Sequence, residues 1–280
     1  MEDFHKILLD KTFVSSLFRP RQPQSHKGDH GHALLVAGSK GRMGAAVIAA
    51  KACLRAGAGL LTVDVPEAER FILQTSLPEA MLTMRAIAVD PSKYTAMGIG
   101  PAFGLEEESL KLLTTALSNH PNRLLLDADA LSLLAGAKDL WPLLPKETII
   151  TPHPGEFDRL FGKHENTAAR EATALKLSRS LPWVIVLKGH HTMICSNGHA
   201  YVNNTGNAGL AKGGSGDALT GMILALLAQG YEPLHAAILA VYLHGLAADI
   251  TLSKQSVESM LITDVIEDIG KAFKELEAEV

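Results

Sequence analysis

The sequence predicts an α/β protein with three layers, in which helices cover both faces of a mainly parallel sheet. Short apolar runs alternate along the chain with segments of helical character, and this alternation is typical of parallel sheets. A strand segment such as residues 33–37 is a short apolar run, as expected for a strand that is buried on both faces. A chain of 280 residues, 47% hydrophobic and 20% charged, is long enough to bury such a core.

The domain begins after a polar lead-in. Residues 1–25 form this lead-in, which Pro20 and Pro23 separate from a single domain predicted over residues 26–280. In the first unit of the domain, strands at 33–37 and 60–65 flank a helix at 45–56.

The same alternation continues toward the C-terminus. Further strands are expected at residues 94–98, 124–126, 148–150 and 183–187, and further helices at 106–117, 156–161, 167–179, 217–229, 233–250 and 263–277. A hairpin with a turn at Asn197-Gly198 is expected between strands at 192–195 and 199–203.

Five loops that follow predicted strands carry most of the glycine, acidic and histidine residues. They are 38–44, 100–104, 127–129, 151–156 and 188–192. Ligands of open parallel sheets bind beyond the carboxyl ends of the strands, so the five loops predict a single site.

The stretch NNTGNAGLAKGGSGDALTGMILALLAQG, residues 203–230, joins a glycine-rich turn to an apolar helix. The turn consists of Gly213, Gly214, Ser215 and Gly216. Its backbone can lie close to a ligand, and the first N–H groups of the helix favour an anion such as phosphate. Asp217 places a carboxylate beside that anion, where it would accept a proton or face a metal. The alternative is a tight turn with an aspartate that only favours the helix start.

Composition and charge argue against several classes of function. A net charge of −4, no basic run and 5% aromatic residues argue against a nucleic-acid partner. Cys53 and Cys195 have no disulfide or zinc spacing and suit a reducing cytosol. The N-terminus lacks the apolar core of a signal peptide, and the uncharged run near 218–228 is too short to span a bilayer. We therefore expect a cytoplasmic protein without a membrane partner.

Polar side chains in the strand-end loops are further candidates for ligand contact. His153 lies between two prolines that keep it out of a regular ladder, and we interpret it as a ligand contact. Glu156 either faces a metal or caps the helix that follows. Lys188 either touches phosphate or is structural, while His190 and His191 carry less signal.

Two acids follow the strand at 124–126. Asp127 and Asp129 offer either a metal site or a helix cap, and we expect Asp129 to be the cap. The sequence contains no GxSxG elbow and no GxxxxGK[ST] loop, so it does not indicate an α/β-hydrolase or a P-loop enzyme.

Six segments of the chain together carry a family resemblance. They are AGSKGRMGAA, GIGPAFG, LLLDADAL, ITPHPGEF, VLKGHHT and NTGNAGLAKGGSGDALTG, within about residues 26–250. In this order they resemble the ADP/ATP-dependent NAD(P)H-hydrate dehydratases of the ribokinase-like superfamily. The resemblance implies a ribokinase-like fold and the repair of the hydrated cofactors NADHX and NADPHX at the expense of ADP or ATP, with Mg²⁺. Because only about 25 residues precede the first segment, the chain resembles the stand-alone dehydratases.

The resemblance also implies a mechanism. Asp217 would take the proton from the C6 hydroxyl of the substrate as its oxygen attacks the terminal phosphoryl group. The amides of residues 213–216 would hold the charge that develops there, and the phosphorylated intermediate would then eliminate phosphate. Because the helix dipole favours the charged carboxylate, we expect Asp217 to be a weak base that needs help from Mg²⁺ and bound phosphate.

Binding residues follow from the same resemblance. The hydrated cofactor would contact Ala45, Gly100, Gly104, His153 and Asp217. The nucleotide would contact Lys188, Gly189, His190, His191, Thr192 and Gly216. Glu156 is the candidate metal ligand, acting through a water.

Two other functions stay open from the sequence. One is a ribokinase-like kinase that releases a stable phosphorylated small molecule of the vitamin type, and the other is a nucleotide sensor without chemistry. The resemblance further implies a homo-oligomer and a functional pairing with a separate NAD(P)HX epimerase.

Overall fold

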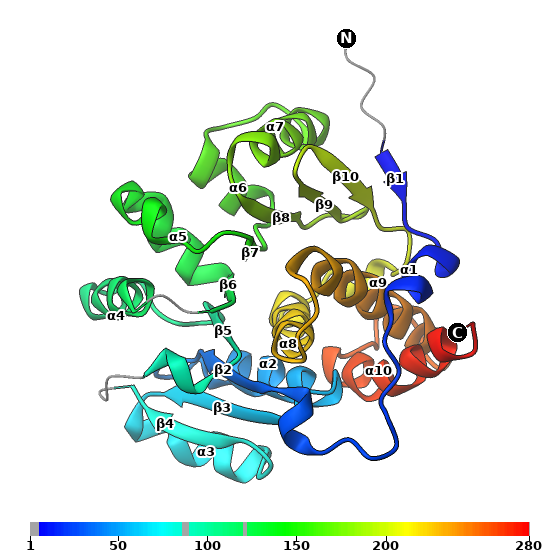
Figure 1. Cartoon of the computed structure of the whole chain (residues 1–280), viewed down its shortest axis with the longest axis horizontal. Coiled ribbons are helices and arrows are strands. Elements are labelled where there is room, and N and C mark those ends of the chain that lie inside the picture. Colours follow the sequence, from blue (N-terminus) through cyan, green and yellow to red (C-terminus); the bar gives the residue numbers. More distant parts are fainter. Residues whose placement is uncertain (1–5, 86–89, 120–121, 280) are drawn as a thin grey trace.

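One continuous sheet of ten strands forms the centre of the protein (Figure 1). The computed structural model describes residues 6–85, 90–119 and 122–279. The strands are β1 (Lys6–Leu8), β2 (His32–Val36), β3 (Leu60–Val65), β4 (Met81–Met84), β5 (Ala96–Ile99), β6 (Leu124–Leu126), β7 (Thr148–Ile150), β8 (Trp183–Leu187), β9 (Met193–Ser196) and β10 (His199–Val202). Their order across the sheet is β1-β10-β9-β8-β7-β6-β5-β2-β3-β4.

Most neighbouring strands are parallel, as the sequence predicts. β9 pairs antiparallel with both β8 and β10, and the other neighbours in the described part of the sheet run parallel. The turn between β9 and β10 has the expected Asn197-Gly198, both with positive φ, which this type of hairpin requires. The carboxyl ends of β2, β5, β6, β7 and β8 therefore meet at one edge, where the loops of the candidate site begin.

Helices cover both faces of the sheet. They are α1 (Lys11–Leu17), α2 (Met43–Arg55), α3 (Arg70–Ser76), α4 (Glu107–Ser118), α5 (Ala128–Gly136), α6 (Pro154–Phe161), α7 (Thr167–Ser180), α8 (Ser215–Ala228), α9 (Pro233–Leu252) and α10 (Ile262–Glu277). Figure 1 shows α8 and α9 inside the curve of the sheet, and α4 to α7 on its outer side. The α/β, three-layer prediction is confirmed.

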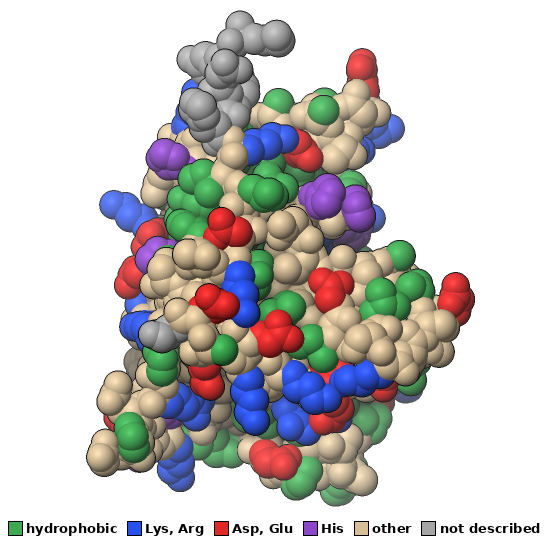
Figure 2. Space-filling view, turned by 90° about the vertical axis from the view of Figure 1, so that its right-hand side faces the viewer, with side chains coloured by type: hydrophobic (Ala, Val, Ile, Leu, Met, Phe, Trp, Pro, Cys, Tyr) green, Lys and Arg blue, Asp and Glu red, His purple; other side chains and the backbone are tan. Residues whose placement is uncertain are grey.

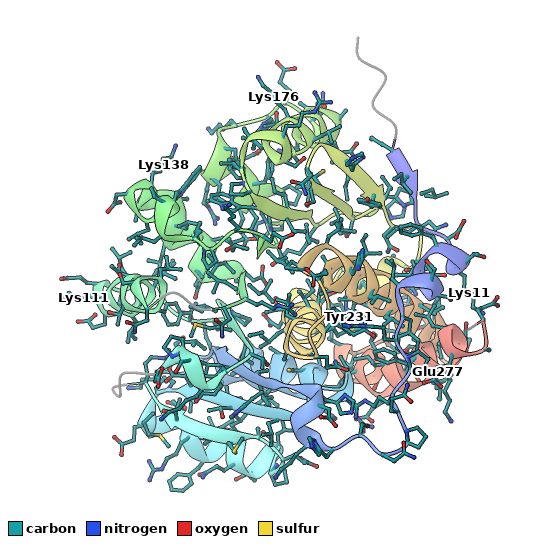
Figure 3. The ribbon with its side chains drawn as sticks, viewed as in Figure 1. Lys11, Lys111, Lys138, Lys176, Tyr231 and Glu277 are labelled. Carbon is teal, nitrogen blue, oxygen red and sulfur yellow. The ribbon has the colours of Figure 1, made fainter. Side chains whose placement is uncertain are left out.

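Successive residues of a strand point to opposite faces, so one strand serves two cores. In β2, Ala33 and Leu35 join the core under α2, α8 and α9, whereas Leu34 and Val36 join the core under α4 and α5. The helices of the outer layer carry charge on their far side. Lys111, Lys138 and Lys176 point outward from that layer in Figure 3.

Helix α9 is a longer apolar segment than the run near 218–228. Among the described residues it is the one helix long and apolar enough to cross a membrane, which corrects the reliance on the shorter run 218–228. The structure buries 72% of its most apolar window inside the protein, next to α8 and α10. This burial is typical of a core helix.

Four elements were missed from the sequence. β1 and α1 lie within the lead-in, and β1 adds a parallel edge strand to β10. α3 and β4 lie between the predicted strands at 60–65 and 94–98, where β4 forms the opposite edge of the sheet. The missed strands are exposed or half-buried edge strands, so they lack the buried apolar run that marks equally short strands such as β6 and β7.

The face that carries α1, α9 and α10 is charged without a dominant sign. Figure 2 shows basic side chains gathered in its lower half with acidic ones among them. Lys51 and Arg55 of α2 both pair with Glu267 of α10, and Lys254 and Lys271 both pair with Asp268. The pairs with the exposed Glu267 contribute little to stability, on the order of 0–1 kcal/mol each, whereas Asp268 is buried and its two lysines offset its burial.

Candidate active site

The glycine-rich turn ends in a left-handed residue that starts α8. Gly214 is the N-cap, with φ of 95°, and no side chain caps the helix. A Cβ on Gly214 would lie 2.7 Å from Cδ1 of Ile48, so both conformation and space require glycine here. The N–H of Ser215 donates to the carbonyl oxygen of Lys212 at 3.3 Å, so the N–H groups that can meet a ligand at the positive end of the helix dipole begin at Gly216.

Asp217 occupies the first turn of α8, as expected, but its electrostatics differ from the expectation. Burial, followed by the charge of the nearby Asp127 carboxylate, raises the pKa of Asp217 to about 6 against the opposing charge of Lys188. The helix dipole does not dominate, which corrects the prediction of a weak base. A carboxyl group with this pKa is largely ionised at neutral pH and is a better proton acceptor than an exposed aspartate.

Asp127 holds three segments together at the end of β6. Its Oδ1 accepts a hydrogen bond from Lys188 Nζ at 2.7 Å, and its Oδ2 accepts one from Thr220 Oγ1 of α8 at 2.7 Å. The Asp127 side chain is 2% exposed. These bonds fix the start of α8 against the ends of β6 and β8.

Lys188 lies among carboxylates. Besides Asp127, its Nζ has Glu156 Oε2 at 3.9 Å. Burial by itself lowers the pKa of Lys188, but the charges of Asp127, Glu156 and Asp217 outweigh burial and raise it, so the ammonium stays charged. A Cβ on Gly216 would lie 3.3 Å from this Nζ, so the missing side chain lets the ammonium approach the start of α8.

His153 and Glu156 form a capping box at the start of α6. His153 Nδ1 accepts from the N–H of Gly155 at 3.0 Å, and Glu156 Oε2 accepts from the N–H of His153 at 2.8 Å. The capping interpretation of Glu156 is thus confirmed as a structural role. Burial, followed by the charge of Lys188, lowers the pKa of His153, so its ring is neutral at physiological pH.

Asp129 does not cap α5, which corrects the sequence prediction. Asp127 is the N-cap residue of α5, although its carboxylate makes no capping bond. Asp129 Oδ2 accepts instead from the N–H of Gly104 at 2.9 Å. Gly100 approaches the same segment, because a Cβ there would lie 1.8 Å from the carbonyl oxygen of Asp127. Two glycines of the 100–104 loop are thereby held against the start of α5.

Two cavities flank this group of charges. The first, which we call the α9 cavity, has a volume of about 590 Å³. It is lined by His153, Lys188, Gly189, His190, Thr192, Asn203, Thr205, Gly206, Asn207, Ala208, Leu210, Ala211, Ser215, Gly216, Leu219, Val241, His244 and Gly245. The second, the α5 cavity, has a volume of about 660 Å³. It is lined by Leu105, Leu110, Ala128, Asp129, Ser132, Leu133, Gly136, Ala137, His153, Glu156 and Arg159.

His153 lines both cavities, and Asp217 lies where charges from both are felt. The pKa of Asp217 responds to Lys188, which lines the α9 cavity, and to Asp129, which lines the α5 cavity. Asp217 itself lines neither cavity, but it directly follows Ser215 and Gly216, which line the α9 cavity, so its partly buried carboxylate lies close to a ligand bound there.

The structure gathers most of the predicted nucleotide residues but not all of the predicted site. Lys188, Gly189, His190, Thr192 and Gly216 share the α9 cavity. His191 is exposed and packs its ring on His190 without lining either cavity. Six other candidates do not line either cavity; they are Ala45, Gly100, Gly104, Gly213, Gly214 and Asp217.

The far wall of the α9 cavity was missed from the sequence. Val241, His244 and Gly245 of α9 form it together with residues 205–211. Asp249 of α9 accepts hydrogen bonds from the N–H of Gly206 and from the side chain of Asn207, which hold this loop in place. The available signal was His244, which lies in the middle of a mostly apolar helix.

A second missed feature is a buried ion pair behind the loops. Arg85 pairs with Asp64 at 3.2 Å, and its guanidinium also donates to the carbonyl oxygens of Ala37, Gly38 and Phe103. One side chain thus connects the loop after β2 to the loop after β5. No motif in the sequence indicates this contact.

Comparison with known proteins places the chain in a family. A family model described as NAD(P)H-hydrate dehydratase matches residues 33–271. The ADP-dependent (S)-NAD(P)H-hydrate dehydratase of Bacillus subtilis is 36% identical, over 93% of this chain and 96% of the relative. The chain belongs to the NAD(P)H-hydrate dehydratase family. The dehydratase of the same name from Listeria monocytogenes is 34% identical, over 91% of each chain.

Other members of the family are longer. The bifunctional NAD(P)H-hydrate repair enzyme of Moorella thermoacetica is 36% identical across all of this chain but over only 56% of its own length. The chain thus spans about half the length of such curated relatives.

Solved structures agree with the family and the fold. The ADP/ATP-dependent NAD(P)H-hydrate dehydratase from Bacillus subtilis, co-crystallised with ATP/Mg²⁺, superposes with a TM-score of 0.86 at 33% identity and covers 97% of this chain and 99% of its own. A hydroxyethylthiazole kinase from Pyrococcus horikoshii has a TM-score of 0.65 at 12% identity, over 88% of this chain and 89% of its own, and shows a shared fold only. The predicted ribokinase-like fold is confirmed.

Proposed function

We propose that this protein dehydrates (6S)-NADHX and (6S)-NADPHX to NADH and NADPH, with ADP or ATP as the co-substrate and release of phosphate. The observation that carries the proposal is the carboxylate of Asp217, which is partly buried at the start of α8 and directly follows Ser215 and Gly216 of the α9 cavity. Family membership gives the reaction class, and the two cavities that share His153 would hold the phosphoryl donor and the acceptor.

The α9 cavity is the proposed nucleotide site. It contains Lys188, Gly189, His190, Thr192 and Gly216, and it opens toward the start of α8. His191, exposed beside His190, completes the segment at the rim. The hydrated cofactor would approach from the side of the α5 cavity, with Ala45, Gly100, Gly104 and His153 bordering its nicotinamide end.

Asp217 would act as the general base of the first step. It would take the proton of the C6 hydroxyl while the hydroxyl oxygen bonds to the terminal phosphorus and the bond from that phosphorus to the nucleotide breaks. The amides at Gly213, Gly214, Ser215 and Gly216 would hold the charge on the transferring group, and loss of one such donor typically costs about 10²–10³ in rate. The C6–O bond then breaks, phosphate leaves with its electron pair, and loss of a proton from C5 restores the dihydropyridine ring.

The donor set fits a Mg²⁺ ion that arrives with the nucleotide. In the described part of the chain, no three His, Cys, Asp or Glu side chains group closely enough to hold a metal by themselves. Mg²⁺ often needs only one or two carboxylates beside phosphates and waters. Glu156 would then reach the ion through a water, and the ion would supply charge neutralisation at the phosphates.

The decisive experiment is incubation of the protein with NADHX, Mg²⁺ and either ADP or ATP. Recovery of the absorbance of reduced nicotinamide, with one phosphate released per turnover, is the expected result, and a reaction without nucleotide is the control. A stable phosphoester would indicate a kinase, and binding without turnover would indicate a sensor; either outcome would overturn the proposal.

Three broader assignments accompany this function. We infer a cytoplasmic location, a homo-oligomer, and cooperation with a separate NAD(P)HX epimerase. The pairing is supported by the bifunctional NAD(P)H-hydrate repair enzymes, which are longer than this chain.

A further inference from the structure

The α5 cavity has the composition of a ligand site. One wall is apolar and is formed by Leu105, Leu110, Leu133 and Ala137, and Asp129 and Ser132 supply polar groups beside it. Cavities that bind small molecules typically combine an apolar lining with a few converging polar groups. Since His153 also lines the α9 cavity, a ligand bound here reaches the region of Asp217.

Arg159 of α6 is the one Lys or Arg side chain among the described residues that line this cavity. Its Nη1 donates to Ser132 Oγ at 3.1 Å, which orients the guanidinium from the opposite wall. In the part of the chain that the structure describes, Arg159 makes no ion pair within 4.0 Å, since the carboxylate of neighbouring Asp158 is taken by Arg170 and His164.

Two other cations near the site are paired. Lys188 bonds to Asp127 at 2.7 Å, and Arg42 lies 3.8 Å from Asp129. Arg159 lies close enough to Glu156 of the same cavity for its charge to oppose the rise that burial causes in the pKa of that carboxyl, but among the described residues it is an oriented cation without an ion pair within 4.0 Å. A planar guanidinium of this kind suits two-point binding of a phosphate group.

The proposed substrate brings phosphate groups into this region. A hydrated dinucleotide carries a diphosphate between its two halves, and NADPHX carries a further phosphate on the adenosine ribose. If the nicotinamide end lies at Asp217, the adenosine half must extend away from it. Because the net charge of the protein is −4, such an anion needs a local donor.

We propose that the α5 cavity receives the adenosine half of the hydrated dinucleotide and that Arg159 binds one of its phosphate groups. The inference rests on the proposed dehydratase function. The apolar wall would pack on the adenine ring, and Ser132 would hold the guanidinium in the orientation that phosphate requires.

A purely structural role for Arg159 makes a different prediction. The residue lies in the last turn of α6, where a positive charge stabilises the helix dipole. In that case its replacement would lower the melting temperature without changing any Michaelis constant. Lys163, an exposed cation just beyond the same helix that does not line the cavity, is the matched control.

The test compares Arg159→Gln, Arg159→Lys and Lys163→Gln by steady-state kinetics. The substrates are NADHX, NADPHX and the hydrate of reduced nicotinamide riboside, which carries no phosphate. For Arg159→Gln we expect the KM of at least one dinucleotide to rise about tenfold or more, the typical value of a hydrogen bond to a charged group. Its kcat, the KM of the nucleotide and kcat/KM for the riboside hydrate should stay within about twofold, as should all constants of Lys163→Gln.

The two dinucleotides identify the phosphate. An equal rise in KM for both supports binding of the diphosphate, and a rise for NADPHX alone supports binding of the ribose phosphate. A smaller rise in KM for Arg159→Lys than for Arg159→Gln would support the inference, since lysine keeps the charge but loses the two-point binding of the guanidinium. Unchanged KM values of Arg159→Gln for both dinucleotides would overturn the inference. So would a fall in kcat/KM for the riboside hydrate that is as large as the fall for the dinucleotides. If the wild-type protein turned over none of the hydrates, the proposed function itself would fail instead.

Discussion

Asp217 illustrates how two opposing effects on one carboxyl group are decided by its surroundings. A position in the first helical turn favours the ionised form, by about 0.3–1 kcal/mol. Burial and the neighbouring Asp127 act in the opposite direction and raise the pKa to about 6. The result is a base whose proton affinity lies close to physiological pH, where general bases are most effective.

The activity should therefore depend on pH through Asp217. Because the base acts in its ionised form, kcat/KM for NADHX should rise with pH, with an apparent pKa near 6, and level off at neutral pH. The measurement is the initial rate across the acidic and neutral range with nucleotide saturating. A profile that stayed flat down to the ordinary range of an exposed aspartate, about pH 4, would contradict the assignment of the base.

Removal of the carboxylate should separate activity from stability. Asp217→Asn should lower turnover by about 10²–10⁴ while nucleotide still binds. The folded-state pKa of Asp217 is raised, so the stability it contributes is present at low pH and is lost as the pH rises through about 6. Above that pH the variant should have a larger free energy of unfolding than the wild type, by an amount on the order of 1–2 kcal/mol, and therefore a higher melting temperature.

Thermal unfolding at two pH values and single-turnover kinetics test this pair of effects. Asp139→Asn, at an exposed position of the 3₁₀ helix Lys138–Leu143, is the control and should change neither quantity. Asp217→Asn that kept a tenth of the wild-type rate or more would remove this residue from the mechanism.

At the scale of the elements, the sequence predicts the strand ends but not the contacts that fix them. The loops at 100–104 and 127–129 are recognisable in the sequence, because glycines and acidic residues interrupt the apolar pattern at the end of a strand. The bond from Gly104 to Asp129, and the role of Asp127 as a link between Lys188 and Thr220, depend on tertiary geometry. Local pattern therefore placed the helix cap on the wrong aspartate.

The Arg85–Asp64 pair is beyond local pattern altogether. Asp64 lies in β3 and Arg85 directly follows β4. Most acceptors of Arg85 are backbone carbonyl oxygens, which every residue has, so no residue type in the sequence marks them. Burial raises the pKa of Asp64 to about 6 in spite of the adjacent guanidinium. Desolvation here is thus a substantial cost that the arginine offsets.

Arg85→Met should consequently destabilise the fold strongly at neutral pH. The variant leaves the Asp64 carboxylate buried without its partner, and such losses typically amount to about 3–5 kcal/mol. The double variant Asp64→Asn, Arg85→Met removes the uncompensated charge and should recover part of the loss. Denaturant unfolding of the wild type and both variants gives the comparison. A double variant less stable than Arg85→Met would show that the charge is not the cause.

At the scale of the whole molecule, residues 6–25 of the lead-in are part of the folded structure. β1 pairs with β10, and Arg19, which follows α1, donates its N–H to the hydroxyl of Tyr231 at 3.0 Å. The guanidinium of Arg19 also lies 3.9 Å from the centre of the Tyr231 ring. Figure 3 shows Tyr231 lying inward, near the end of α8. The parallel sheet was predictable from repeated apolar runs, whereas a three-residue edge strand was not.

Two neighbouring leucines allow the contribution of this segment to be measured. Leu8 is 58% exposed at the end of β1, and Leu9 is fully buried in the core with α1. Leu9→Ala should therefore lower the free energy of unfolding by about 2–5 kcal/mol, since it leaves a cavity, while Leu8→Ala should change it by less than about 0.5 kcal/mol. Equilibrium unfolding in urea measures both. Equal effects would mean that the first 25 residues do not share the main core, and the strand order at this edge of the sheet would need another explanation.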